Sequence, residues 1–324
     1  MKPIRYYGWT GHTNFGDDVC KEIIKTLKFT FNKKSDTMLF GGGTLLPLHP
    51  NQNLYKENIG DLEPKRKIIL GSGVLGKNDA AKITAKKLVS YDDELSFTKK
   101  YFKDCKHIGL RDEESRKILG MGEVIGDPLF WVKINRSIYK KEIPEYAVLN
   151  MGFSEGNVIG DVSAQLNYAK EVLKFTKKFV IGKLGLKVAV LPLQNYDIPF
   201  NNMATVYLGQ DNILKFEIKN KISQILETMT HAKFAITYKQ HGMIAAIASN
   251  IPVIPMAYSK KTINVAKEFK LENHIIPLNK VSEKTLEEKY HALKDWPYKR
   301  IENKKEEYRK NTFNFIKKIN NDFK

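Results

Sequence analysis

Short apolar runs alternate with amphipathic segments along residues 1–131, a pattern typical of a parallel α/β domain. Glycine-rich or polar turns end most of these runs, and acidic residues open the helical segments that follow. The runs that suit buried strands begin near residues 3, 38, 67, 107 and 123. The pattern predicts an N-terminal Rossmann-like domain over residues 1–131.

The same alternation restarts after a lysine-rich break at residues 132–145. It predicts a second Rossmann-like domain over residues 146–298, with strands at 146–153, 187–194, 232–237 and 251–258 and helices between them. Residues 299–324 then place apolar side chains on one face at helical spacing. We expect a C-terminal helix there that packs back on one or both domains.

The composition favours a folded cytoplasmic protein. The chain has 324 residues, 42% of them hydrophobic, but no run near the roughly 20 apolar residues that cross a membrane. Its first residues lack the apolar segment of a signal peptide. Cys20 and Cys105 are far apart and show no metal-binding spacing, so we expect neither a disulfide framework nor a metal site.

The formal charge of +18 is spread along the chain as single and paired lysines. Three interpretations remain open: a lysine-rich solvated surface, a basic face that docks on an anionic membrane, or nucleic-acid binding. The third is weakest because no helix-turn-helix, zinc-finger or RRM signature accompanies the charge. We therefore expect no specific nucleic-acid partner.

Residues 232–262 contain the strongest candidate site. Two predicted strands end in polar segments, the first with Lys239 and His241 and the second with residues 259–261, read as a basic loop. Ligands of open α/β sheets bind at this edge. A histidine between lysines, at the start of a helix, suits an anionic substrate and proton transfer. A lone histidine is more often structural, so that alternative stays open for His241.

Two glycine segments follow predicted strands in the first domain. Residues 41–43 can cradle an anion through backbone N–H groups or simply turn the chain. Residues 71–76 match G-x-G-x-x-G, but they follow the third predicted strand instead of the first. A close backbone approach is therefore favoured there over a dinucleotide site.

Two polar segments of the first domain have both structural and functional interpretations. Turn and helix-cap chemistry explains Asn14 and Asp17 well. Arg111 can bind a carboxylate through two parallel hydrogen bonds, or it can pair with Asp112 or Glu113.

Taken in order, these segments resemble the polysaccharide pyruvyl transferase family over residues 8–262. Each segment is weak evidence alone, but seven in sequence are fairly specific. The matching segments are Asn14–Asp17, Gly41–Gly43, Gly71–Gly73, Arg111–Ser115, Asp127–Phe130, Lys239–His241 and Tyr258–Lys261. The chain departs from the family pattern at Lys239, which replaces an arginine, and in the last segment, which reads Tyr-Ser-Lys-Lys. Where the family pattern has a pair of acidic residues, this chain has only Asp197.

The resemblance implies two Rossmann-like domains in a GT-B arrangement, with the acceptor on the N-terminal side and the donor on the C-terminal side. It implies transfer of pyruvate from phosphoenolpyruvate to two hydroxyls of a sugar, with no other cofactor and no metal. His241 would be the general acid, and Asp17 or Asp197 would orient or deprotonate a hydroxyl. The substrate-binding residues it implies are Lys239, Lys261, Arg111, Asn14, Gly42, Gly43, Ser72 and Tyr258.

The acceptor implied is a saccharide of the cell envelope. A lipid-linked precursor would place the basic protein at the inner face of the membrane. Two alternatives remain: a GT-B glycosyltransferase that uses a nucleotide-sugar, and a non-catalytic binder of anionic glycan or nucleic acid. Sugar-nucleotide affinity would favour the first, and salt-dependent polynucleotide binding that ignores His241 would favour the second.

Overall fold

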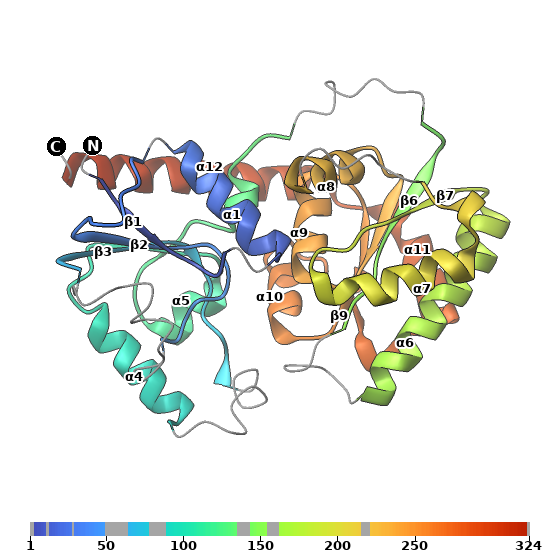
Figure 1. The fold of residues 1–324 in the computed structure, drawn as a ribbon, viewed down its shortest axis with the longest axis horizontal. Coiled ribbons are helices and arrows are strands. Elements are labelled where there is room, and N and C mark those ends of the chain that lie inside the picture. Colours follow the sequence, from blue (N-terminus) through green and yellow to red (C-terminus); the bar gives the residue numbers. More distant parts are fainter. Residues whose placement is uncertain are drawn as a thin grey trace. The chain divides into compact units, whose positions relative to one another are not determined.

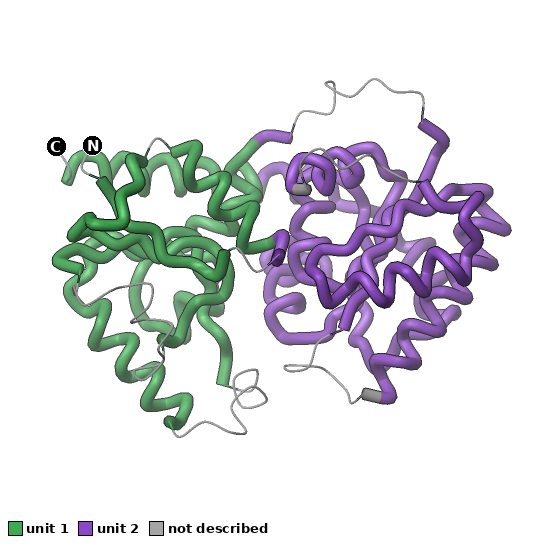
Figure 2. Tube along the Cα trace, viewed as in Figure 1, with its two compact units in different colours: residues 1–12, 16–132, 304–324 green, residues 13–15, 133–303 purple. Residues whose placement is uncertain are grey.

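The computed structural model describes residues 3–10, 13–27, 29–48, 64–77, 89–134, 143–153, 162–214 and 221–322 (Figure 1). The chain divides into two compact units (Figure 2). Unit 1 comprises Met1–His12, Gly16–Val132 and Lys304–Lys324, and unit 2 comprises Thr13–Phe15 and Lys133–Asn303. Residues 135–142 of the predicted linker lie outside the described residues.

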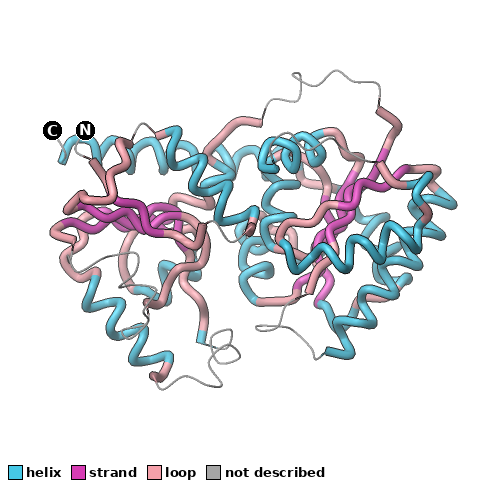
Figure 3. The backbone as a smooth tube through the Cα atoms, in the orientation of Figure 1, coloured by secondary structure: helices cyan, strands magenta, loops and turns pink. Residues whose placement is uncertain are grey.

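Unit 1 is built on a five-stranded parallel sheet whose strands follow chain order, β1-β2-β3-β4-β5. Figure 3 shows the strands in magenta. The strands are β1 (Arg5–Tyr7), β2 (Thr37–Gly41), β3 (Arg66–Ser72), β4 (His107–Leu110) and β5 (Glu123–Val124). Its described helices before residue 132 are α1 (Phe15–Thr26, with Phe15 itself in unit 2), α4 (Tyr91–Tyr101) and α5 (Glu113–Leu119). Strands of this kind, apolar on both faces, need cover on both sides.

The long helix α12 (Tyr298–Asp322) supplies part of that cover. Phe315 and Ile319 pack with Leu39 and Ile68 of the sheet, which confirms that the C-terminal helix packs back on the body. Thr312 anchors the helix to the segment after β5 by donating a hydrogen bond to the Ile125 carbonyl at 3.0 Å. None of the described helices is both long and apolar enough to cross a bilayer.

Unit 2 contains a second five-stranded parallel sheet, in the order β10-β9-β8-β6-β7. Its strands are β6 (Tyr146–Asn150), β7 (Lys187–Val190), β8 (Phe234–Thr237), β9 (Val253–Ala257) and β10 (Ile276–Pro277). The chain begins at β6, adds β7 on one side and then continues with β8 on the other. The strand order therefore reverses between β6 and β8, which is the switch point where open α/β sheets bind ligands.

The helices of unit 2 include three that the sequence did not predict. Its helices are α6 (Val162–Phe175, continued by a π-helical stretch Thr176–Lys183), α7 (Ile198–Leu208), α8 (Lys221–Thr230), α9 (Gln240–Ala248), α10 (Lys260–Glu268) and α11 (Glu283–Ala292). The prediction of a basic loop at residues 259–261 was wrong, because α10 begins at Lys260. Neither α7 nor α11 was predicted at all.

Helix α9 is apolar on all sides and almost wholly buried, as its small and aliphatic residues require. The helix begins at Gln240, so His241 lies in its first turn. Asn250 follows the helix with φ +57°, a left-handed conformation that asparagine tolerates. The chain therefore turns out of the helix at this residue.

Candidate active site

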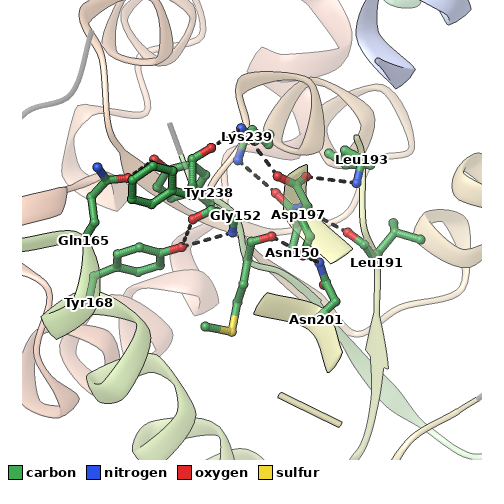
Figure 4. Close-up of polar contacts among 12 residues, drawn as sticks. Asn150, Gly152, Gln165, Tyr168, Leu191, Leu193, Asp197, Asn201, Tyr238 and Lys239 are labelled. Carbon is green, nitrogen blue, oxygen red and sulfur yellow. Dashed lines mark hydrogen bonds and ion pairs between the residues drawn. The ribbon is translucent and has the colours of Figure 1, made fainter. Parts of the chain in front are cut away.

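A buried polar cluster occupies the switch point of unit 2 (Figure 4). Asn150 ends β6 and donates from its amide nitrogen to the Leu191 carbonyl at 3.0 Å. Its amide oxygen accepts the Lys239 backbone N–H at 2.9 Å. Asn150 therefore ties the segments after β7 and β8 to the end of β6.

Lys239 and Asp197 form an ion pair within this cluster. Their Nζ and Oδ1 atoms are 3.5 Å apart, and the Asp197 side chain is fully buried. Lys239 Nζ also donates to the Phe153 carbonyl at 2.9 Å, and Asp197 Oδ2 accepts the Leu193 N–H at 3.1 Å. Burial raises the pKa of Asp197, and the positive charge of Lys239 opposes that rise. The charge of Lys239 is therefore held in place by a buried partner.

Gly152 leaves the space that this ion pair occupies. A Cβ atom at residue 152 would lie 2.3 Å from Asp197 Oδ1 and 3.0 Å from Lys239 Cε. Any larger residue would push the two charges apart. Asn150 and Gly152 were not among the predicted site residues, although a strand ending in Asn-Met-Gly was a usable signal.

Three tyrosine rings stack beside the ion pair. Tyr168 and Tyr238 have ring centres 5.1 Å apart, and Tyr238 and Tyr258 have ring centres 4.7 Å apart. Burial raises the pKa of Tyr168 and of Tyr238. Tyr238 donates from its hydroxyl to Gln165 at 3.1 Å.

Tyr258 differs from its two neighbours because two ammonium groups lie beside it. Lys261 Nζ is 5.4 Å and Lys239 Nζ is 5.7 Å from its ring centre. Burial alone would raise the pKa of the Tyr258 phenol, but the charges of Lys261 and Lys239 outweigh it and lower that pKa below its usual value. The structure thus brings Lys239, Tyr258 and Lys261 together, as the sequence predicted for one edge of the sheet.

The first turn of α10 adds hydroxyl groups to this edge. Ser259 precedes the helix as its cap residue and Thr262 lies in the first turn, and both are buried. Neither hydroxyl has a hydrogen-bond partner among the described residues. The Gln240 amide donates to the Lys261 carbonyl at 3.1 Å, which joins this turn to α9. Free N–H groups at a helix start, with nearby hydroxyls and a lysine, suit an anionic ligand.

His241 is half-buried in the first turn of α9. Lys239 is the cap residue of that helix, and its own side chain makes no capping hydrogen bond to the helix N–H groups. Four of the predicted site residues therefore belong to the two helix starts that follow β8 and β9 in unit 2. They are Lys239, His241, Tyr258 and Lys261.

The glycine triplet of unit 1 makes room for α1. Gly42 and Gly43 have φ of +68° and +56°, and a Cβ at residue 43 would lie 2.2 Å from Asp17 Oδ1. A Cβ at residue 42 would lie 2.4 Å from the Cβ of Cys20. The favoured close approach at Gly73 is also to a side chain of this unit, because a Cβ there would lie 2.5 Å from Arg111 Nη2.

Of the two alternatives predicted for Arg111, the structure shows the ion pair with Asp112. The side chain is 3% exposed, and its Nε donates to Asp112 Oδ2 at 3.2 Å. Burial opposes the charge, but Asp112 and Asp127 outweigh it and raise the pKa of Arg111. Asp112 also caps α5 by accepting the Ser115 N–H at 2.8 Å. The predicted substrate contact of Arg111 stays a prediction.

Three further predicted site residues, Ser72, Asp17 and Asn14, are buried or half-buried. Ser72 is buried, and its hydroxyl accepts a long hydrogen bond of 3.4 Å from the Leu45 N–H. Asp17 is half-buried in the first turn of α1, where its charge favours the helix dipole. Asn14 is half-buried and belongs to unit 2. The substrate roles assigned to these three residues stay predictions.

Solved structures with a similar fold include UDP-GlcNAc 2-epimerase from Methanocaldococcus jannaschii. It has a TM-score of 0.54 and 12% identity, over 86% of this chain and 74% of that one. This likeness shows the fold and confirms the predicted GT-B type of α/β structure.

Two further structures fall below a TM-score of 0.5. Trehalose 6-phosphate synthase from Burkholderia multivorans has a TM-score of 0.48 and 7% identity, over 88% of this chain and 69% of that one. TarM has a TM-score of 0.47 and 14% identity over 89% of this chain, which spans 55% of TarM.

Comparison with curated proteins gives no significant match. A family model described as polysaccharide pyruvyl transferase matches residues 5–260. The match includes both sheets except β10, and all seven segments on which the resemblance rests except the final lysine. The chain therefore belongs to the polysaccharide pyruvyl transferase family.

Proposed function

We propose that the protein transfers pyruvate from phosphoenolpyruvate to two hydroxyls of one sugar and forms a cyclic ketal. Family membership supports a transferase. The observation that carries the donor assignment is the start of α10, where Lys261 lies beside Tyr258 and two buried hydroxyls without partners among the described residues.

The charge at this edge fits the donor. Phosphoenolpyruvate carries a phosphate and a carboxylate, so its site needs cations and N–H or O–H donors. Lys261 forms no ion pair with a carboxylate in the part of the chain that the structure describes, whereas Lys239 is paired with Asp197. Of these two lysines, Lys261 therefore has the charge that is more available to a ligand, with Ser259 and Thr262 as nearby donors.

The reaction balances without a redox cofactor. A proton adds to C3 of the donor, the first sugar hydroxyl bonds to C2, and the C2–O bond to phosphate breaks. The second hydroxyl then bonds to C2 and closes the ketal. Of the two protons that the hydroxyls lose, one replaces the proton given to C3 and the other leaves with phosphate.

His241 is our general acid for C3 or for the departing phosphate. Its position in the first turn of α9 supports this role, because Lys239 and Lys261 of the same unit attract the donor to that edge. Asp17 remains the proposed group that orients or deprotonates a sugar hydroxyl. The acceptor proposed is a saccharide of a cell-surface polysaccharide or its lipid-linked precursor.

Thermal unfolding with a set of ligands tests this proposal. Phosphoenolpyruvate at about 100 times its Kd should stabilise the wild type by roughly 2.7 kcal/mol, a shift of several degrees. Lys261→Met should lose the shift, and Lys260→Met is the matched control because Lys260 is exposed and starts the same helix. The control should keep the shift.

The other ligands in the set decide between the alternatives. Stabilisation by a nucleotide-sugar alone would overturn the proposal in favour of a glycosyltransferase. Salt-dependent stabilisation by a polynucleotide alone would point to a non-catalytic binder. A sugar acceptor added with phosphoenolpyruvate should release phosphate and yield a ketal detectable by mass.

A further inference from the structure

Helix α7 exposes an apolar face. Its eleven residues carry no charge, and five of its six exposed residues are apolar. Val206 is 81% exposed, and Met203 and Tyr207 are each 42% exposed. The exposed apolar residues of α7 are Ile198, Pro199, Met203, Val206 and Tyr207. A helix of a water-soluble protein normally presents polar side chains on this face.

The apolar surface continues onto α6. The two helices line a groove of about 490 Å³, to which α6 contributes Leu166, Ala169 and Leu173. Leu166 is 61% exposed. Six of the nine exposed large hydrophobic side chains among the described residues lie between Leu166 and Tyr207. Such clustering marks an interaction surface, because isolated exposed apolar residues are common but contiguous patches are not.

Lysines border this surface. Residues 162–214 contain six lysines and three acidic residues, one of which is the buried Asp197. Lys174 and Lys178 pair with Glu171 and Glu283, respectively. Lys170 and Lys177 have no carboxylate partner in the described parts of the chain.

The positions of Lys170 and Lys177 place positive charge at the edge of the apolar surface. Lys170 lines the groove. Lys177 is exposed, and its Nζ lies 4.9 Å from the Tyr207 ring centre. An apolar face with basic and aromatic residues at its border is typical of a helix that lies in a membrane interface.

We propose that the α6–α7 surface, defined as Leu166–Lys177 together with Tyr196–Tyr207, binds an anionic lipid bilayer. Val206, Met203 and Leu166 would enter the boundary between headgroups and acyl chains, and Lys170 and Lys177 would contact anionic headgroups. A second copy of the chain fits less well. A symmetric contact through this face would bring the unpaired lysines of both copies together.

The position of α7 connects this surface to the site. The helix begins directly after Asp197, the partner of Lys239. The Phe200 ring stacks on Phe153 at 6.1 Å, and the Phe153 carbonyl accepts the Lys239 ammonium. A bilayer bound at α7 would present a lipid-linked saccharide near this edge, a role that rests on the proposed function.

Vesicle flotation of the full chain tests the surface. The wild type should float with vesicles of phosphatidylglycerol and phosphatidylcholine, and weakly or not at all with phosphatidylcholine alone. The double variant Met203→Glu, Val206→Glu should lose at least tenfold in binding. Lys170→Gln, Lys177→Gln should lose roughly 10- to 30-fold at low salt. The matched control is Phe313→Glu, since Phe313 is 70% exposed on α12, and it should bind like the wild type.

Absence of wild-type binding to anionic vesicles would overturn the inference, and so would an equal loss in the Phe313→Glu control. Light scattering measures the alternative occupant. A wild type that is dimeric and does not bind lipid, with a Met203→Glu, Val206→Glu variant that is monomeric, would assign the surface to a second copy instead. The thermal shift with phosphoenolpyruvate should be unchanged in this pair, which also shows that it folds. If the wild type floats with anionic vesicles but shows no thermal shift with phosphoenolpyruvate, the membrane-binding surface is supported and the proposed donor is rejected.

Discussion

The carboxyl edges of the two parallel sheets use their polar and glycine residues differently. In unit 1, Gly43 and Gly73 accommodate Asp17 and Arg111 of the same unit, and Arg111 pairs with Asp112. In unit 2, two helix starts combine Lys261 with buried hydroxyls that have no partner among the described residues. The strand order reverses only in the second of the two sheets described.

This difference indicates how similar-looking motifs should be interpreted. A polar residue after a parallel strand is a ligand candidate only if the fold leaves its charge or hydrogen-bonding capacity unused. Arg111 fails this criterion because its Nε donates to Asp112. Lys261 meets it because no carboxylate among the described residues pairs with its charge. Family resemblance alone gave the two residues equal standing.

The largest effect is expected at His241 in unit 2. His241→Asn should reduce the turnover of phosphoenolpyruvate about 10²- to 10⁴-fold, because the proposed general acid is lost. Phosphate release in the presence of a sugar acceptor measures it. The thermal shift with phosphoenolpyruvate should persist, and turnover equal to that of the wild type would remove His241 from the proposed chemistry.

Breaking the buried ion pair should have the next largest effect. Lys239→Met leaves the Asp197 carboxyl unpaired and should lower the free energy of unfolding by about 3 kcal/mol, measured by urea denaturation. Adding Asp197→Asn should recover much of the loss. The loss in Lys239→Met should also grow as the pH rises through the raised pKa of Asp197, because that carboxyl must then ionise while buried. Equal stability of the single variant and the wild type would show that the pair is not structural.

A change at the carboxyl edge of the unit 1 sheet should lower the stability of the protein without changing its affinity for phosphoenolpyruvate. Gly43→Ala should cost about 2 kcal/mol, because alanine is strained at φ +56° and its Cβ would meet Asp17. Gly185→Ala is a control with the same sign of φ, +66°, and open space around the added Cβ. It should cost about 1 kcal/mol. Equal losses would argue against the steric role of Gly43.

The smallest effect is a shift in the ionisation of one tyrosine. The difference in ultraviolet absorbance between the wild type and Tyr258→Phe should show a phenol that ionises below the usual pH of about 10. Because the folded pKa is lowered, the phenolate adds stability fully above that pH and loses it as the pH falls through the folded value. Lys261→Met should move the ionisation upward, and an unchanged curve would separate Lys261 from Tyr258.

The sequence predicted the helix α9 and the strands of both units except β10, because buried parallel strands and a small-residue helix have distinct patterns. β10 was missed because it has only two residues. The sequence also missed α7, whose apolar residues lie partly on an exposed face and whose start contains Pro199. It also read the start of α10 as a loop, since two lysines at a helix N-terminus oppose the dipole.

Part of the site was beyond local pattern. Asn150 and Lys239 are joined by a hydrogen bond across 89 residues of sequence, and only the pairing of β6 with β8 brings them together. The packing of Gly152 against Asp197 likewise depends on tertiary contacts. His241, Lys239 and Lys261 could be named because each follows a recognisable strand.

Titration calorimetry with phosphoenolpyruvate on one variant from each edge tests the central claim most directly. Lys261→Met should lose at least tenfold in affinity while keeping most of its stability, because Lys261 pairs with no carboxylate among the described residues and its buried neighbour Tyr258 remains a neutral phenol without it. Gly43→Ala should lose stability but keep its affinity. Undiminished affinity in Lys261→Met together with lost affinity in Gly43→Ala would contradict the assignment of the donor to unit 2.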